Sequence, residues 1–212
     1  MVENIVLLAF IASLCSADTA AFGQFMISRP IFCAPFIGFL MGDIGTSIWI
    51  GMIVEMIWIN AVPMGVALPI DTSAISILSV VWVCKYFKES HRAAIWGLVL
   101  AVLFAYLYRT IDIYGRKLNI KIMHWVEKGI RYGKYGRIDM GVIVSLFFFV
   151  ARSFLFYVFA MIIGGWIYKA VYFQFPEFIL LGFEKAWYIL PIAGFGMAIY
   201  SYRNIKVKFK RR

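Results

Sequence analysis

Seven apolar runs, each at least 12 residues long, occupy most of this 212-residue chain. The chain is 63% hydrophobic and 18% aromatic but only 15% charged, and this composition excludes an ordinary soluble protein. None of the runs alternates like a β-strand, so helices rather than a closed barrel satisfy the backbone in lipid. We therefore predict an all-α, polytopic membrane protein, with apolar runs near residues 4–17, 30–41, 44–59, 70–87, 93–108, 140–172 and 178–202.

Several of these runs are too short to cross a membrane as straight helices, which takes about 20 residues. Gly42-Asp43, Pro63, Gly65 and Pro69 interrupt the series. Short, broken or re-entrant helices of this kind leave backbone groups that face a polar cavity, as in the core of a transporter. A simpler alternative is that several short helices pack around structural glycine and proline residues.

The segment 109–139 is predicted to be a basic, amphipathic loop. Between residues 109 and 137, eight basic residues stand against Asp112 and Glu127, a balance typical of the cytoplasmic side of a membrane. The formal net charge of +10 is spread over such flanks, which argues against nucleic acid as a partner. Apolar residues at helical spacing predict a helix over 117–132 that lies on the cytoplasmic membrane surface in contact with lipid; they are Leu118, Ile122, Val126 and Ile130.

Charge alone leaves the topology open. Lys85, Lys88 and Arg92 make the connection before the run 93–108 basic, so both ends of that run carry the cytoplasmic signal. Either this run is a hairpin or re-entrant segment, or one basic cluster lies outside. We divide the chain into an N-terminal membrane region with polar substrate-path segments, a basic amphipathic loop, C-terminal membrane helices and a basic tail, at residues 1–108, 109–139, 140–202 and 203–212.

The run 44–59 contains a carboxylate, Glu55, that composition does not explain. The nearest basic residues in the sequence are Arg29 and Lys85. A charge deep in a membrane costs about 2.5 to 3.5 kcal/mol on insertion scales and usually marks a pathway or polar pocket. Small residues before Glu55 let a neighbouring helix approach closely, but this does not account for the carboxylate. Glu55 ends a stripe at four-residue spacing, formed by Asp43, Ser47, Gly51 and Glu55.

Further polar residues flank the other interruptions. Asp71 follows a proline and precedes Thr72, so it is either a helix N-cap, a cavity-lining residue, or both. Asp18 and Gln24 flank the break between the first two runs, where Asp18 could also serve only as a helix terminus. Carboxylates and amides suit sugar hydroxyls, with Trp49 and Trp58 available for the apolar face of a sugar, although a proton or sodium site would use the same carboxylates. The candidate substrate-binding residues are Glu55, Asp71, Gln24, Asp18, Asn60 and Thr72.

Signals for chemistry on this chain are weak. Cys15, Cys33 and Cys84 lie inside apolar runs without metal-site spacing, and are interpreted as packing residues. His91 and His124 are isolated in basic segments, and no nucleotide-binding loop or nucleophile elbow occurs. We expect no metal, no cofactor, and no catalytic or phosphoryl-accepting residue.

Two stretches carry a resemblance to a known family: SRPIFCAPFIGFLMGDIGTSIWIGMIVEM and, after it, ALPIDTSAISI. Their order is RP, then GD, then a glycine-spaced helix ending in Glu, then P and D. This pattern resembles the membrane IIC subunit of the mannose/sorbose family of bacterial phosphotransferase sugar permeases. Arg152 and two further stretches extend the match over nearly the whole chain; the stretches are HWVEKGIRYGKYGRID and PEFILLGFEKAWYILPIAGFGMA.

The resemblance implies a sugar-translocating, multi-pass subunit of a PEP-dependent permease in the bacterial inner membrane, with a hexose-type sugar at a midplane pocket. It also implies a IID membrane partner and soluble IIA and IIB phosphocarriers. Glu55 and Asp71 match positions where the family places polar residues of the sugar path, and Gln24 is a weaker match. Two departures stand out: Ser47 replaces an expected glycine, and the sequence stops at KFKRR, which implies a shortened relative that is complete only with a partner.

Two other functions remain open at this stage. One is a structural or regulatory membrane subunit without its own substrate, in which Glu55 pairs with a group on a partner. The other is an ion-coupled secondary transporter that uses Glu55 and Asp71 as proton sites.

Overall fold

The computed structural model describes residues 4–20, 23–59, 69–88 and 90–210. Within these ranges the secondary structure is entirely helical, which confirms the predicted fold class. The elements are α1 (Ile5–Ala20), α2 (Pro30–Met41), α3 (Ile44–Ile57), α4 (Thr72–Tyr86), α5 (His91–Arg131), α6 (Arg137–Phe159), the π-helical turn η1 (Ala160–Gly164), α7 (Gly165–Tyr172) and α8 (Glu177–Lys210).

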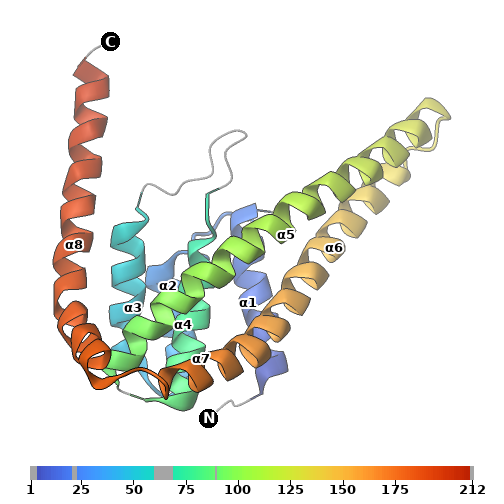
Figure 1. The fold of residues 1–212 in the computed structure, drawn as a ribbon. Helices are drawn as coiled ribbons and strands as arrows, with labels where there is room; N and C mark the ends of the chain where they lie inside the picture. The colour runs from blue at the N-terminus through green and yellow to red at the C-terminus, as the bar shows by residue number, and fades with distance from the viewer. Residues whose placement is uncertain (1–3, 21–22, 60–68, 89, 211–212) are drawn as a thin grey trace.

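The first four helices form a compact N-terminal bundle in the middle of the molecule (Figure 1). Its central element is α4, in which every residue from Ser73 to Cys84 is buried. A helix that is covered on all sides must be apolar or carry small hydroxyls that bond internally. Ser76 and Ser79 meet this condition, because their Oγ atoms donate to the carbonyl oxygens of Ser73 and Ile75.

Helices α2 and α3 form a tight antiparallel hairpin. Gly42 ends α2 in the left-handed region at φ 79°, a conformation that glycine adopts without a steric cost. Asp43 then caps α3 by accepting from the amide of Thr46 at 3.1 Å. A Cβ on Gly51 would lie 2.6 Å from the carbonyl oxygen of Pro30, so the two backbones approach where a side chain is absent. This supports the interpretation of Ser47 and Gly51 as close-packing residues.

Helix α5 is continuous over 41 residues, so the alternative in which the run 93–108 forms a hairpin is wrong. Its beginning lies at the bottom of the view and its end at the upper right, which puts the basic α4–α5 connection and the basic α5–α6 turn far apart (Figure 1). The predicted boundary at residue 109 is therefore not the start of a separate element. The helix predicted over 117–132 exists, but as the outer half of α5.

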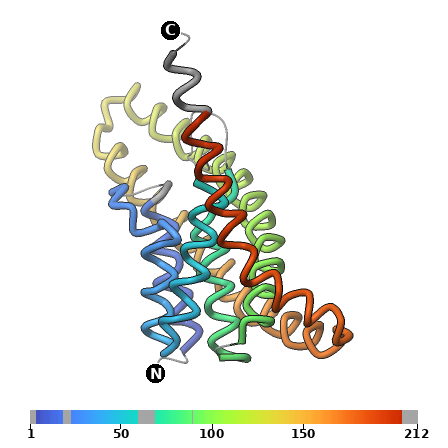
Figure 2. The backbone as a smooth tube through the Cα atoms, turned by 90° about the vertical axis from the view of Figure 1, so that its left-hand side faces the viewer, coloured from blue at the N-terminus to red at the C-terminus, as the bar shows by residue number. Residues whose placement is uncertain are grey.

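The outer half of α5 pairs with α6 to form a protruding arm (Figure 1). Beyond the arm, η1 connects α6 to α7 by a single π-helical turn, a feature that often redirects a helix. Helix α8 then runs along α3 and α5 and rises away from the bundle, as the rotated view also shows (Figure 2). Arg92 and Glu184 hold its start to α5, with a nitrogen–oxygen distance of 2.6 Å.

In the described part of the chain, three helical stretches are long and apolar enough to cross a bilayer: His91–Arg131, Arg137–Tyr172 and Glu177–Arg203. The four helices of the N-terminal bundle are shorter apolar helices of 10–17 residues. The prediction of short helices therefore describes the bundle, with Gly42 at the break between α2 and α3, and the long spans come later in the chain. Of the other predicted interruptions, Pro63 and Gly65 lie outside the described residues.

The close approach in the α2–α3 hairpin can be tested with Gly51→Ala. We expect the free energy of unfolding to fall by about 1–3 kcal/mol, because the new Cβ meets backbone rather than a movable side chain. Gly45→Ala is the matched control in the same helix, since nothing lies within 4 Å of its Cβ position. Thermal unfolding in detergent measures both. Equal unfolding temperatures for the two variants would contradict the hairpin geometry.

Candidate functional site

The predicted site residues gather at one end of the N-terminal bundle. Helices α1 and α3 finish at this end, and α2 and α4 begin there (Figure 1). Asp18, Gln24, Glu55, Asp71 and Thr72 lie on or beside these four helix ends. Asn60, the sixth predicted residue, lies outside the described residues.

Glu55 has an ion-pair partner that the sequence did not single out. The Nη1 atom of Arg29, at the N-cap of α2, donates to Oε1 of Glu55 at 3.1 Å. The side chains are 34% and 20% exposed, so the pair is only partly screened by solvent. The second oxygen of Glu55, Oε2, is buried and has no hydrogen-bond partner among the described residues. A buried acceptor without a partner is costly, and a donor supplied by a ligand would satisfy it.

Asp71 caps α4. Its Oδ1 accepts from the amides of Ser73 and Ala74, at 2.9 and 3.3 Å, and from the hydroxyl of Ser73 at 2.5 Å. The N-cap alternative is therefore correct for Oδ1. All three hydrogen bonds end on that one oxygen, and they fix the carboxylate at the start of a buried helix next to Thr72.

Asp18 organises the turn between α1 and α2. Its Oδ1 accepts from the amide of Phe25 at 2.7 Å, and its Oδ2 accepts from the amide and hydroxyl of Ser28, both at 3.2 Å. Since both oxygens bind the chain itself, the geometry gives Asp18 a structural role. Its predicted contact with substrate stays a prediction.

The turn that Asp18 holds is strained. Gln24 and Met26 have φ values of 51° and 65°, in a region that non-glycine residues rarely adopt. Strain of this kind costs on the order of 1–3 kcal/mol per residue and gathers at ligand-binding sites. The same turn leads directly to Arg29, so Asp18 also sets the position of the Glu55 partner. The side chain of Gln24 is exposed at this end of the bundle.

Glu55 differs from the three aspartates of the bundle. Asp18, Asp43 and Asp71 each accept hydrogen bonds from backbone amides at a helix end or turn. Glu55 instead lies near the end of α3, where free carbonyls rather than free amides occur, and its described partner is a side chain. Helix capping therefore does not explain Glu55.

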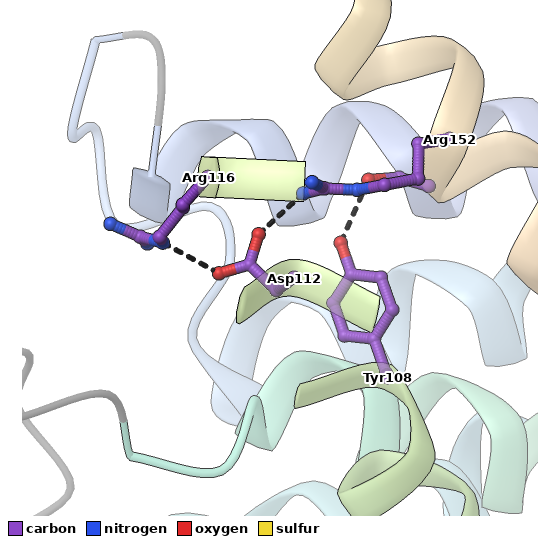
Figure 3. A network of polar contacts seen from close by, with 5 residues as sticks. Tyr108, Asp112, Arg116 and Arg152 are labelled. Atoms are coloured by element: carbon purple, nitrogen blue, oxygen red, sulfur yellow. Dashed lines mark hydrogen bonds and ion pairs between the residues drawn. The ribbon is translucent and has the colours of Figure 1, made fainter. Parts of the chain in front are cut away.

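A second polar cluster lies in the arm, away from these residues. Figure 3 shows Arg116 and Arg152 reaching Asp112 from two sides, with Tyr108 beside them. Arg152 lies over Gly115, where any Cβ would overlap its guanidinium. The hydroxyl of Tyr108 bonds that of Ser153 at 2.7 Å. Arg152 entered the sequence prediction only through the family resemblance, yet an arginine in a long apolar run indicates a buried partner.

Metal binding has no support in the described part of the chain, because no cluster of three His, Cys, Asp or Glu residues occurs there. The three cysteines are buried and unpaired with one another. The Sγ atom of Cys33 on α2 lies 3.2 Å from the Oγ atom of Ser76 on α4, as expected if Cys33 is a packing residue.

The fold and its apolar helices define a polytopic, all-helical membrane protein. The family profile described as the PTS system sorbose-specific IIC component matches residues 2–207. The chain belongs to this family, the sugar-transport membrane IIC subunits of the phosphotransferase system.

Individual relatives agree with this assignment. The mannose-specific EIIC component of Escherichia coli (strain K12) is 24% identical over 199 residues, which cover 93% of this chain and 73% of that protein. The sorbose-specific EIIC component of Klebsiella pneumoniae is 21% identical, over 94% of this chain and 73% of that protein. The fructose permease IIC component of Bacillus subtilis (strain 168) is 22% identical, over 92% and 71%.

Solved structures show the same fold. A chain in the complex of the mannose transporter ManYZ with microcin E492 gives a TM-score of 0.67 at 24% identity, covering 96% of this chain and 81% of that one. A second chain, described as a membrane protein, gives a TM-score of 0.76 at 23% identity, covering 95% and 81%.

The Arg29–Glu55 pair can be tested by a double-mutant cycle with alanine. We expect a coupling free energy of about 0.5–3 kcal/mol, because each single variant leaves the other charge without its partner. The exposed Arg131–Glu127 pair on α5 serves as a control, with a smaller expected coupling because solvent screens both charges. Denaturant unfolding in mixed micelles measures both cycles. Coupling no larger than that of the control would remove the pair from the structure of the site.

Proposed function

We propose that this chain is the sugar-translocating IIC subunit of a PEP-dependent permease and that Glu55 binds a hexose-type sugar. The observation that carries this proposal is the buried Oε2 of Glu55, which has no hydrogen-bond partner among the described residues while Arg29 binds the other oxygen. A sugar hydroxyl donates the hydrogen bond that this oxygen lacks. The relatives support the class of substrate, because mannose, sorbose and fructose are all hexoses.

Each neighbouring residue has a distinct proposed task. Arg29 positions the Glu55 carboxylate, and its own position follows from the turn that Asp18 holds. Asp71 contributes its carboxylate, which hydrogen bonds from Ser73 and Ala74 hold at the start of α4 beside Thr72. Gln24 and Thr72 offer an amide and a hydroxyl at the same end of the bundle. These groups would read several hydroxyls of one sugar.

Aromatic residues would cover the apolar face of the sugar. Trp58 is the C-cap of α3 and lies three residues after Glu55, which makes it the better candidate. Trp49, the other tryptophan considered, packs against Trp187 of α8 at a ring-centroid distance of 6.4 Å. We therefore assign Trp49 to the α3–α8 contact rather than to the sugar.

We propose the location and the partner proteins of this chain from its family. We propose a bacterial inner-membrane location, a IID membrane partner, and separate IIA and IIB proteins that deliver phosphate to the sugar. On this proposal, translocation is the task of this chain, and it needs no phosphoryl-accepting residue. The likeness of this chain to a chain of the solved mannose transporter ManYZ supports the proposed partner.

Glu55→Ala tests the proposed sugar contact. We expect the complex to assemble but to bind sugar about 10- to 150-fold more weakly, because a hydrogen bond to a charged group contributes about 1.5–3 kcal/mol. Glu55→Gln should lose less sugar affinity than Glu55→Ala if Glu55 acts mainly as a hydrogen-bond acceptor. Glu184→Gln is the control, since it removes a carboxylate from an ion pair on α8. Sugar affinity and assembly are measured on the same preparation. Normal affinity in assembled Glu55→Ala, or failed assembly as the primary defect, would support a structural subunit instead.

A membrane partner is expected to co-purify with the chain from native membranes. Many large apolar side chains of α6 and α8 are exposed, Phe147 and Ile192 among them, and a second subunit or lipid must cover them. Crosslinking followed by mass spectrometry identifies the protein bound. A stable, monodisperse single chain that transports sugar without any partner would exclude the proposed IID subunit.

A further inference from the structure

A groove in the arm, about 650 Å³ in volume, is separate from the proposed sugar site. One wall comes from α5 and includes Asp112, Arg116 and Asn119. The other comes from α6 and includes Leu146, Phe149 and Arg152, within a lining that is largely apolar. A cavity with a few polar groups on an apolar surface is a typical ligand site.

The polar part of the groove carries excess positive charge. Arg116 uses its Nε to bond Asp112 at 2.8 Å, and Arg152 uses Nη2 for the other oxygen of the same carboxylate. Two guanidinium groups thus share one carboxylate, as Figure 3 shows. The Arg116 side chain is 49% exposed, so its terminal nitrogens can donate to an added anion. The Oδ1 atom of Asn119 is buried and lacks a partner among the described residues.

The apolar part of the groove continues onto the outside of α6. Between residues 138 and 151, α6 has a single charged residue, Asp139. Val142 lines the groove and is 64% exposed, and Phe147 nearby is 74% exposed. The α5 side of the arm instead holds most of the charge. The two helices together are therefore amphipathic, with the groove at the junction between the charged and apolar sides.

We propose that this groove binds an anionic glycerophospholipid, with its phosphate at Arg116 and Arg152 and an acyl chain against Leu146 and Phe149. A phospholipid supplies an anion and hydrocarbon in one molecule, which matches both parts of the groove. The eight basic residues between 109 and 137, against two acidic ones, would attract an anionic membrane surface to the arm. A soluble anion would satisfy the arginines but leave the apolar wall uncovered.

The test measures lipid binding by native mass spectrometry on the delipidated, full complex. The probes are dioleoyl phosphatidylglycerol and dioleoyl phosphatidylcholine, which share acyl chains and differ in net charge. We expect the anionic lipid to bind at least about tenfold more tightly. Arg116→Gln should weaken binding of the anionic lipid by about tenfold, because the phosphate loses one guanidinium group. The arm should stay folded, because the Arg152–Asp112 pair that links the two helices remains.

Two further variants separate the groove from a general effect of charge. Lys121→Gln removes the same charge from an exposed position of α5 outside the groove, and should change affinity less than about twofold because a detergent micelle lacks an anionic surface. Ser145→Phe fills the groove without changing its charge and should prevent binding.

Several results would overturn the proposal. Equal losses in Arg116→Gln and Lys121→Gln would indicate a diffuse charge effect. Unchanged binding in folded Ser145→Phe would place the lipid elsewhere. Displacement of the lipid by millimolar inorganic phosphate would indicate a site for a free anion. Density for a partner polypeptide in the groove of the assembled complex would identify a protein interface instead.

Discussion

Backbone amides at the helix breaks are the constraint on which the N-terminal bundle depends. Four short helices begin or end inside an apolar structure, and each beginning leaves amides without an intrahelical acceptor. The chain places an aspartate at three of these breaks: Asp18 in the turn before α2, Asp43 before α3 and Asp71 before α4. Each of these carboxylates accepts from at least one amide at its break, which reduces the number of backbone donors left without an acceptor.

This arrangement also builds the proposed sugar site. Because the helices alternate in direction, the ends of α1 and α3 and the beginnings of α2 and α4 meet at the same end of the bundle (Figure 1). Asp18 shapes the turn that carries Arg29, and Arg29 holds one oxygen of Glu55. The groups that satisfy the backbone thus also orient the side chain proposed to bind sugar. Polar groups would otherwise be too costly to keep at this position.

The arm formed by α5 and α6 covers apolar surface outside the bundle. Helix α5 continues well beyond the bundle and would expose a row of apolar side chains if it stood alone. Pairing with α6 covers part of that row, and Asp112 and Arg152 connect the two helices deep in the arm. Gly115 makes this connection possible, because any side chain there would collide with Arg152. The arm therefore brings charged groups beside an apolar surface, which is the basis of the proposed lipid site.

The amino-acid sequence determined that the chain lies in a membrane, that it is helical, and where most of its helices lie. The run predicted at 30–41 coincides with α2, and that at 44–59 differs from α3 by two residues at its end. Long apolar runs allow few alternatives in lipid, because only helices satisfy the backbone there. Glu55 was identifiable for the same reason, as a charge in a run that offers it no nearby partner.

Only the tertiary structure decided the pairing of these groups. The sequence places Arg29 and Glu55 26 residues apart, and only the folding of the α2–α3 hairpin brings them to 3.1 Å. The sequence singled out Glu55 among the candidate carboxylates at 18, 55 and 71, but it left open which of Asp18 and Asp71 cap helices, because that depends on which amides the fold presents to them. Periodicity predicted the helix over 117–132 but not its union with α5 or its pairing with α6. An apolar stripe on a helix indicates that one face of the helix will be buried. Which other helix buries that face depends on where helices distant in the sequence begin and end in the fold.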